Sequence, residues 1–113
     1  MARKKNQDAD ERIIYGEEIP LYTITIYNDN ETTAKFVIKV LEQVFEQTHH
    51  DSFLIMMRAN IWGQAQLGVY LHDEAERIVN KATKMARDEG FPLRFSYERY
   101  VHGKSRVFIR TGK

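Results

Sequence analysis

Apolar and polar positions follow two kinds of pattern, and together these divide most of the chain into six elements. Strict alternation predicts strands over residues 21–27, 64–71 and 93–98. Apolar residues at three- and four-residue spacing predict helices from about residues 33, 51 and 73. The order β-α-α-β-α-β indicates an α/β fold, an α+β sandwich in which a small antiparallel sheet packs against three helices.

Capping and turn residues set the expected boundaries of these elements. Thr32 is expected to cap the first helix and Asp51 the second, with Gly63 as the stop of the second. Gly90 and Pro92 are expected to end the third helix. In the second strand, the alternation predicts one shared face for four apolar residues, which are Ala65, Leu67, Val69 and Leu71.

The two ends of the chain differ from its middle. Residues 1–17 mix both charge signs with little apolar content and are predicted to form a flexible arm. Residues 18–99 hold the predicted domain, and residues 100–113 form a basic extension with a possible fourth strand. The last twenty residues carry six Lys or Arg against one Glu, which fits either a solvated strand face or an anionic partner.

Composition excludes several classes of protein. The 113 residues suffice for one domain, and the absence of cysteine excludes disulfides and a thiolate nucleophile. No run is long and apolar enough to span a bilayer, so we expect a cytoplasmic protein without membrane contact. Neither a nucleophile motif nor a phosphate-binding loop is present. We therefore expect no enzyme activity, no cofactor and no metal site.

A cluster of polar side chains follows the first strand. Asn28, Asp29 and Asn30 lie at the expected strand-to-helix turn, where such residues commonly bond nearby backbone groups. The same acceptors can also bind a small cation such as an ammonium group. The pattern alone leaves both interpretations open.

Several short motifs in a fixed order make this chain resemble the ClpS family, the adaptors of bacterial Clp ATP-dependent proteases. The strand ending in Asn-Asp, the Met-containing second helix, the Gly-x-Ala-x-x-Gly-Val-Tyr strand and the Ala-x-x-x-Ala-Arg segment before Pro-Leu carry the resemblance. The matching residues are Asn28, Asp29, Thr32, Phe36, Val37, Met56, Gly63, Ala65, Gly68, Val69, Tyr70, Ala75, Glu76, Ala82, Ala86, Arg87, Pro92 and Leu93.

The resemblance implies an adaptor that binds proteins with a large apolar first residue and delivers them to a Clp ATPase. It implies that Asn28, Asp29 and Asn60 surround the substrate's α-amino group, with Asn60 standing where the family has His. An ammonium group has three donors and no acceptor, so a selective site must offer acceptors. An amide oxygen at Asn60 can still accept a hydrogen bond, although its reach is shorter than that of an imidazole.

The family's other contact surfaces also map onto this chain. The resemblance implies an apolar pocket for the first side chain, lined by Thr32, Ala34, Met56, Ala59 and Leu93. Because Ala34 replaces a larger residue of the family, we expect the pocket to accept β-branched Ile or Val as well, or bulkier groups. Docking to the N-terminal domain of the ATPase is implied for Asp73 and Arg77, in a protein that we expect to be a monomer.

Two further interpretations stay open. Asn60, Asn30 and Ala34 depart from the family pattern, so the chain could be an interaction module that no longer binds N-termini. The basic end interleaves Arg and Lys with Phe95, Tyr97 and other aromatic residues, which could contact nucleic acid.

Overall fold

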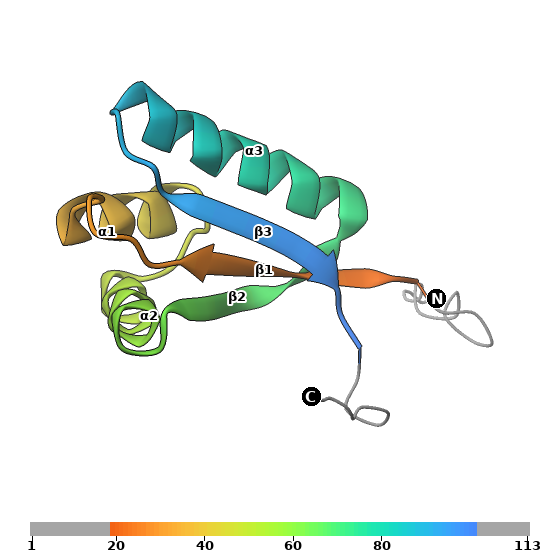
Figure 1. Ribbon diagram of the computed structural model, residues 1–113. Helices are drawn as coiled ribbons and strands as arrows, with labels where there is room; N and C mark the ends of the chain where they lie inside the picture. The colour runs from red at the N-terminus through yellow and green to blue at the C-terminus, as the bar shows by residue number, and fades with distance from the viewer. Residues whose placement is uncertain (1–18, 102–113) are drawn as a thin grey trace.

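A computed structural model describes residues 19–101, which form a three-stranded sheet and three helices (Figure 1). The elements are β1 (Leu21–Tyr27), α1 (Ala34–Gln43), α2 (His49–Trp62), β2 (Gln64–Leu71), α3 (His72–Asp88) and β3 (Arg94–Arg99). The expected order and fold class are confirmed. The predicted arm and the possible strand after residue 101 lie outside the described residues. Of the helices in residues 19–101, none has the length and hydropathy needed to cross a membrane.

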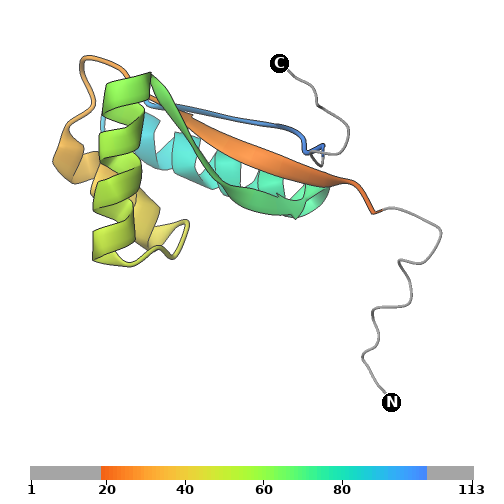
Figure 2. The same ribbon diagram turned by 90° about the horizontal axis from the view of Figure 1, so that it is seen from below.

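β1 lies at the centre of the sheet and pairs antiparallel with β2 on one side and β3 on the other. Its residues Ile24 and Ile26 are fully buried in the core. Figure 2 shows α3 running along the sheet, whereas α1 and α2 pack at the end of the sheet where β1 stops. The turn that follows β1 therefore emerges beside α2.

The starts of the first two helices differ from the expected ones. The Thr33 hydroxyl accepts a hydrogen bond from the Phe36 backbone N–H at 3.1 Å, so Thr33 and not Thr32 caps α1. The Thr48 hydroxyl accepts from the Asp51 N–H at 3.0 Å, so Thr48 and not Asp51 caps α2. The predicted stop at Gly63 is confirmed, because this residue ends α2 in the left-handed region with φ 90°.

A β-bulge interrupts β2 and changes which side chains face the core. Thr23 pairs with Val69 but Thr25 pairs with Gln66, so β2 has one extra residue between these pairs. Gly68 accommodates the bulge with φ 127°. Beyond it Tyr70 packs against the core, while Val69 and Leu71 are exposed. The prediction that Val69 and Leu71 share the buried face is therefore wrong.

Aromatic rings close the core beneath the sheet. Phe45 stacks on Phe95 with centroids 5.4 Å apart, and Phe95 is buried. Tyr97 is half-buried and its ring edge contacts Tyr22 and His72. Phe95 is thus unavailable for base stacking, which weakens the nucleic-acid interpretation.

Candidate functional site

The turn after β1 is organised by the carboxylate of Asp29. Its Oδ1 accepts hydrogen bonds from the backbone N–H groups of Glu31 at 2.8 Å and Thr32 at 2.7 Å. Its Oδ2 accepts from the Thr32 hydroxyl at 2.8 Å. The Thr32 hydroxyl is therefore bonded to Asp29, and the Thr33 hydroxyl caps α1 instead. Oδ2 accepts this one hydrogen bond within the turn and can accept a second from a bound group.

The environment of Asp29 favours its charged form. Burial is the largest single influence and raises its pKa, but hydrogen bonds from the Thr32 and Glu31 N–H groups and the Thr32 hydroxyl act in the opposite direction. The charge of Arg87 adds to them, and the pKa falls below its ordinary value of 3.8. Asp29 is an anion at neutral pH.

One hydrogen bond fixes this turn to the end of α2, and two others fix the segment that contains Leu93 to α3. The Asn28 N–H donates to the Gly63 carbonyl at 3.0 Å, which ties the turn to the end of α2. Arg87 donates from Nη1 to the carbonyl oxygens of Phe91 at 2.9 Å and Leu93 at 2.8 Å, and so orders the segment before β3. The turn therefore keeps a defined position against the end of α2, and Leu93 keeps one against α3.

These three segments enclose a small hollow, here called the Asn28 cleft. Its lining residues are Ile26, Tyr27, Asn28, Asp29, Thr32, Val37, Met56, Ala59 and Leu93. The cleft has a polar rim at Asn28 and Asp29 and an apolar interior. Its volume is about 20 Å³, which holds about one water molecule. A large side chain can enter only if the walls move, and half-buried Met56 has the flexible side chain to allow it.

The structure brings together most of the residues expected at one site. Asn28, Asp29, Thr32, Met56, Ala59 and Leu93 all line the cleft. Ala34 and Asn60 do not; both are exposed, Ala34 as the first residue of α1 and Asn60 near the end of α2. Ile26, Tyr27 and Val37 line the cleft without having been expected there. Val37 belongs to the apolar face of α1. The sequence pattern of such a face is the same whether its residues line a cleft or pack in the core.

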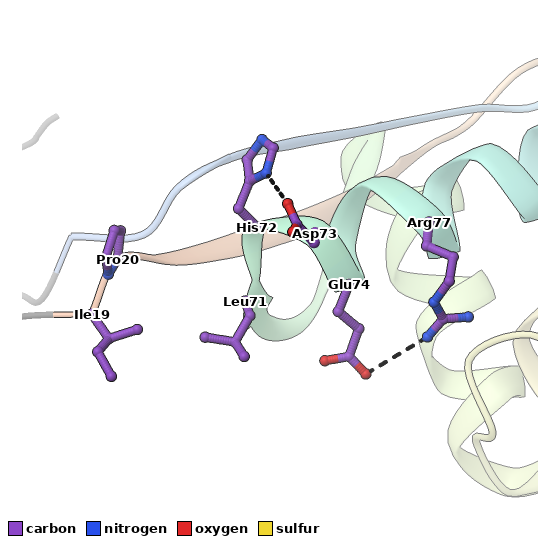
Figure 3. Close-up of a pocket in the computed structure, with 7 residues that line it drawn as sticks. All are labelled: Ile19, Pro20, Leu71, His72, Asp73, Glu74 and Arg77. Atoms are coloured by element: carbon purple, nitrogen blue, oxygen red, sulfur yellow. Dashed lines mark hydrogen bonds and ion pairs between the residues drawn. The ribbon is translucent and has the colours of Figure 1, made fainter. Parts of the chain in front are cut away.

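The residues expected to dock the ATPase lie on a second, larger surface, here called the α3 groove (Figure 3). Its volume is about 640 Å³, and its lining residues are Ile19, Pro20, Leu71, His72, Asp73, Glu74 and Arg77. His72 Nδ1 lies 3.0 Å from Asp73 Oδ1, and Arg77 Nη2 lies 4.0 Å from Glu74 Oε2. The start of α3 therefore contributes charged groups of both signs to the groove, and the apolar residues Ile19, Pro20 and Leu71 lie beside them.

The start of α3 also brings together one His and two acidic residues that the sequence did not single out as a group. Ligand atoms of His72, Asp73 and Glu76 lie within 4.8 Å of one another, and all three residues are exposed. Exposed acidic clusters are common on helix N-terminal turns, where they complement the helix dipole. The role of Asp73 and Arg77 in docking stays a prediction.

A polar-rimmed apolar cleft at the end of one central strand, in a sheet packed against three helices, defines the class: a small α+β binding domain. The family described as ATP-dependent Clp protease adaptor protein ClpS matches residues 17–96. The Clp protease adapter ClpS of Myxococcus xanthus is 38% identical over 79 residues, covering 70% of this chain and 74% of its own. That of Deinococcus radiodurans is 38% identical over 84 residues, covering 74% of each chain.

A solved structure shows the same architecture. Agrobacterium tumefaciens ClpS2 bound to L-phenylalaninamide is 34% identical, with a TM-score of 0.72, covering 74% of this chain and 100% of that one. The matched region includes every described helix and strand up to residue 96. The chain belongs to the ClpS family of Clp protease adaptors.

Proposed function

We propose that this protein binds polypeptides whose first residue is large and apolar and delivers them to a Clp ATPase for degradation. The observation that carries the proposal is the Asn28 cleft, where an ionised carboxylate and an amide stand beside an apolar interior. An N-terminal residue presents the matching pair of groups, a cationic amine and a side chain on the same carbon atom.

The polar rim supplies acceptors for the amine. Asp29 Oδ2 and the side-chain oxygen of Asn28 each accept one ammonium proton, and Asn60 accepts the third from the end of α2. Asn60 follows Met56, which lines the cleft, by four residues, so the two side chains are neighbours on α2. An internal peptide N–H or an acetylated terminus has a single donor and cannot match three acceptors.

The apolar interior selects the first side chain. Val37, Met56, Ala59 and Leu93 surround the hollow, and rotation of Met56 would open it to a Leu or Phe side chain. Burying such a side chain contributes about 1.5–3 kcal/mol. Ala34 lies outside this lining at the start of α1, and its short side chain adds no obstacle to a β-branched first residue, so the opened cleft also accepts Ile and Val.

Delivery to the ATPase uses the α3 groove. It places Asp73 and Arg77 beside exposed apolar residues Ile19 and Leu71, a mixed surface suited to a reversible protein contact. We assign this groove to the N-terminal domain of the Clp ATPase. The groove and the cleft are formed from different residues, so one monomer can hold substrate and ATPase together.

Binding of fluorescent peptides tests the proposal. Peptides that begin with Leu, Phe, Trp or Ile are compared with an N-acetylated Leu peptide, on the native protein and on two variants. Asp29→Asn removes the anion from the rim, whereas Glu31→Gln removes a neighbouring exposed charge and keeps the three bonds to Asp29. We expect binding to be lost when the peptide is acetylated and in the Asp29→Asn variant, and to be kept in Glu31→Gln. Equal binding of the acetylated peptide contradicts the proposal.

A second candidate is an interaction module that no longer binds N-termini. It is favoured by the small volume of the cleft and by the position of Asn60 outside its lining. A folded protein that binds none of the peptides, but retains a Clp ATPase that Asp73→Ala releases, would establish it.

A further inference from the structure

One face of α2 exposes apolar side chains without an evident structural reason. Phe53, Leu54 and Ile61 are 43%, 42% and 64% exposed, and Met57 between them is half-buried. We call these four residues the α2 outer stripe. Arg58 is the one charged residue from 52 to 62. A surface helix normally carries polar residues on its outer side, so this stripe is typical of a binding surface.

The α2 outer stripe continues from the Asn28 cleft on the same helix. Met56, which lines the cleft, follows Phe53 of the stripe by three residues, so their side chains are neighbours on α2. Asn60 follows Met57 by three residues and Phe53 by seven, a spacing that places these side chains on one side of a helix. Cleft, Asn60 and stripe therefore form one continuous surface.

We propose that the α2 outer stripe binds an apolar side chain at the third position of the substrate, so that the adaptor reads residue three as well as residue one. The inference rests on the proposed function of the Asn28 cleft. An extended peptide directs successive side chains to opposite sides, with about 6.6–6.8 Å between residues one and three. Neighbouring side chains on a helix have Cβ atoms about 5–6 Å apart. With residue one in the cleft beside Met56, residue three reaches Phe53, the stripe residue that neighbours Met56 on α2.

The second side chain of the same extended peptide points away from the protein. A third side chain on the stripe also covers apolar surface that is otherwise in water, whereas a polar third residue leaves it exposed. Partial burial of one Leu side chain corresponds to about a fivefold gain in affinity.

Four peptides that differ only in their first three residues test the inference: Leu-Ser-Ser, Leu-Leu-Ser, Leu-Ser-Leu and Ser-Ser-Leu, each followed by the same polar tail and a fluorophore. Each is titrated on the native protein and on the double variant Phe53→Gln/Ile61→Gln. The matched control is Val69→Thr, which changes an exposed apolar residue, 45% exposed, on the edge strand β2. Thermal unfolding checks that all variants are folded.

The inference predicts that Leu-Ser-Leu binds about fivefold more tightly than Leu-Ser-Ser. The double variant removes that difference while the affinity for Leu-Ser-Ser is unchanged, and Val69→Thr preserves it. Equal affinity for all three Leu peptides overturns the inference, and so does a preference for Leu-Leu-Ser. Either result leaves the proposed function intact. Failure of every Leu peptide to bind overturns the proposed function and the inference with it.

Discussion

Replacing Asp29 separates its structural role from its binding role. Asp29→Ala removes three hydrogen bonds to one carboxylate, from the Glu31 N–H, the Thr32 N–H and the Thr32 hydroxyl. Asp29→Asn keeps the Oδ1 acceptor for both backbone donors and loses the negative charge. The two variants therefore differ mainly in whether the turn keeps its backbone bonds.

The expected cost of Asp29→Ala is modest because the turn is partly exposed. Hydrogen bonds to a charged group contribute about 1.5–3 kcal/mol each when they cannot be replaced. Here water reaches the freed N–H groups, so we expect a total loss of about 2 kcal/mol, close to the largest helix-cap effects. Asp29→Asn should cost about 0.5 kcal/mol. For a domain of this size, the melting temperature should fall by about 8–16 °C in Asp29→Ala and by about 2–4 °C in Asp29→Asn.

Urea unfolding at pH 7 and pH 3 measures both effects. The folded-state pKa of Asp29 lies below the unfolded value, so its charge stabilises the fold above the unfolded pKa. That contribution is lost as pH falls through the folded pKa. The difference between native protein and Asp29→Asn should therefore shrink at pH 3. If Asp29→Ala unfolds within 0.5 kcal/mol of the native protein, the three bonds do not hold the turn.

Three other predictions concern the core and the cleft. The buried Ser52 hydroxyl has no hydrogen-bond partner within the described residues, so Ser52→Ala should raise stability by about 1 kcal/mol in the same assay; a loss would reveal a hidden partner. Ala34→Met should lower affinity for Ile-initial peptides about threefold more than for Leu-initial ones, because added volume at the start of α1 hinders β-branched side chains; equal losses would contradict this. Among residues 19–101 no histidine lines the cleft, so affinity should stay constant from pH 7 to pH 5 and fall above about pH 8 as the α-amine loses its proton; a fall between pH 7 and 6 would contradict it.

The alternating patterns allowed the strands to be predicted from sequence. The bounds of β1 and β2 agree with the expected 21–27 and 64–71, because Pro20 and Gly63 mark where each strand begins. The helix starts were less predictable. Thr32 and Thr33 are chemically equivalent as caps, and the choice depends on Asp29 holding the Thr32 hydroxyl, a contact that no local pattern reveals.

The face reversal in β2 follows from a single residue. A glycine inside an alternating strand often marks a bulge, and Gly68 has the positive φ of such a position. A bulge at Gly68 predicts Val69 and Leu71 on the outer face. Most of the cleft lining was predictable because the resemblance to the family assigns a role to individual positions of this sequence. The positions of Ala34 and Asn60 outside its lining were not, since they depend on side-chain directions at the two helix ends.

Amide-resolved NMR titration with leucinamide and its N-acetylated counterpart tests the central claim most directly. The account predicts that leucinamide shifts the signals of Asn28, Asp29, Thr32 and Ala59, while the acetylated compound leaves them unchanged. Shifts confined to the α3 groove, or equal shifts with both compounds, would contradict the assignment of the Asn28 cleft to N-terminal recognition.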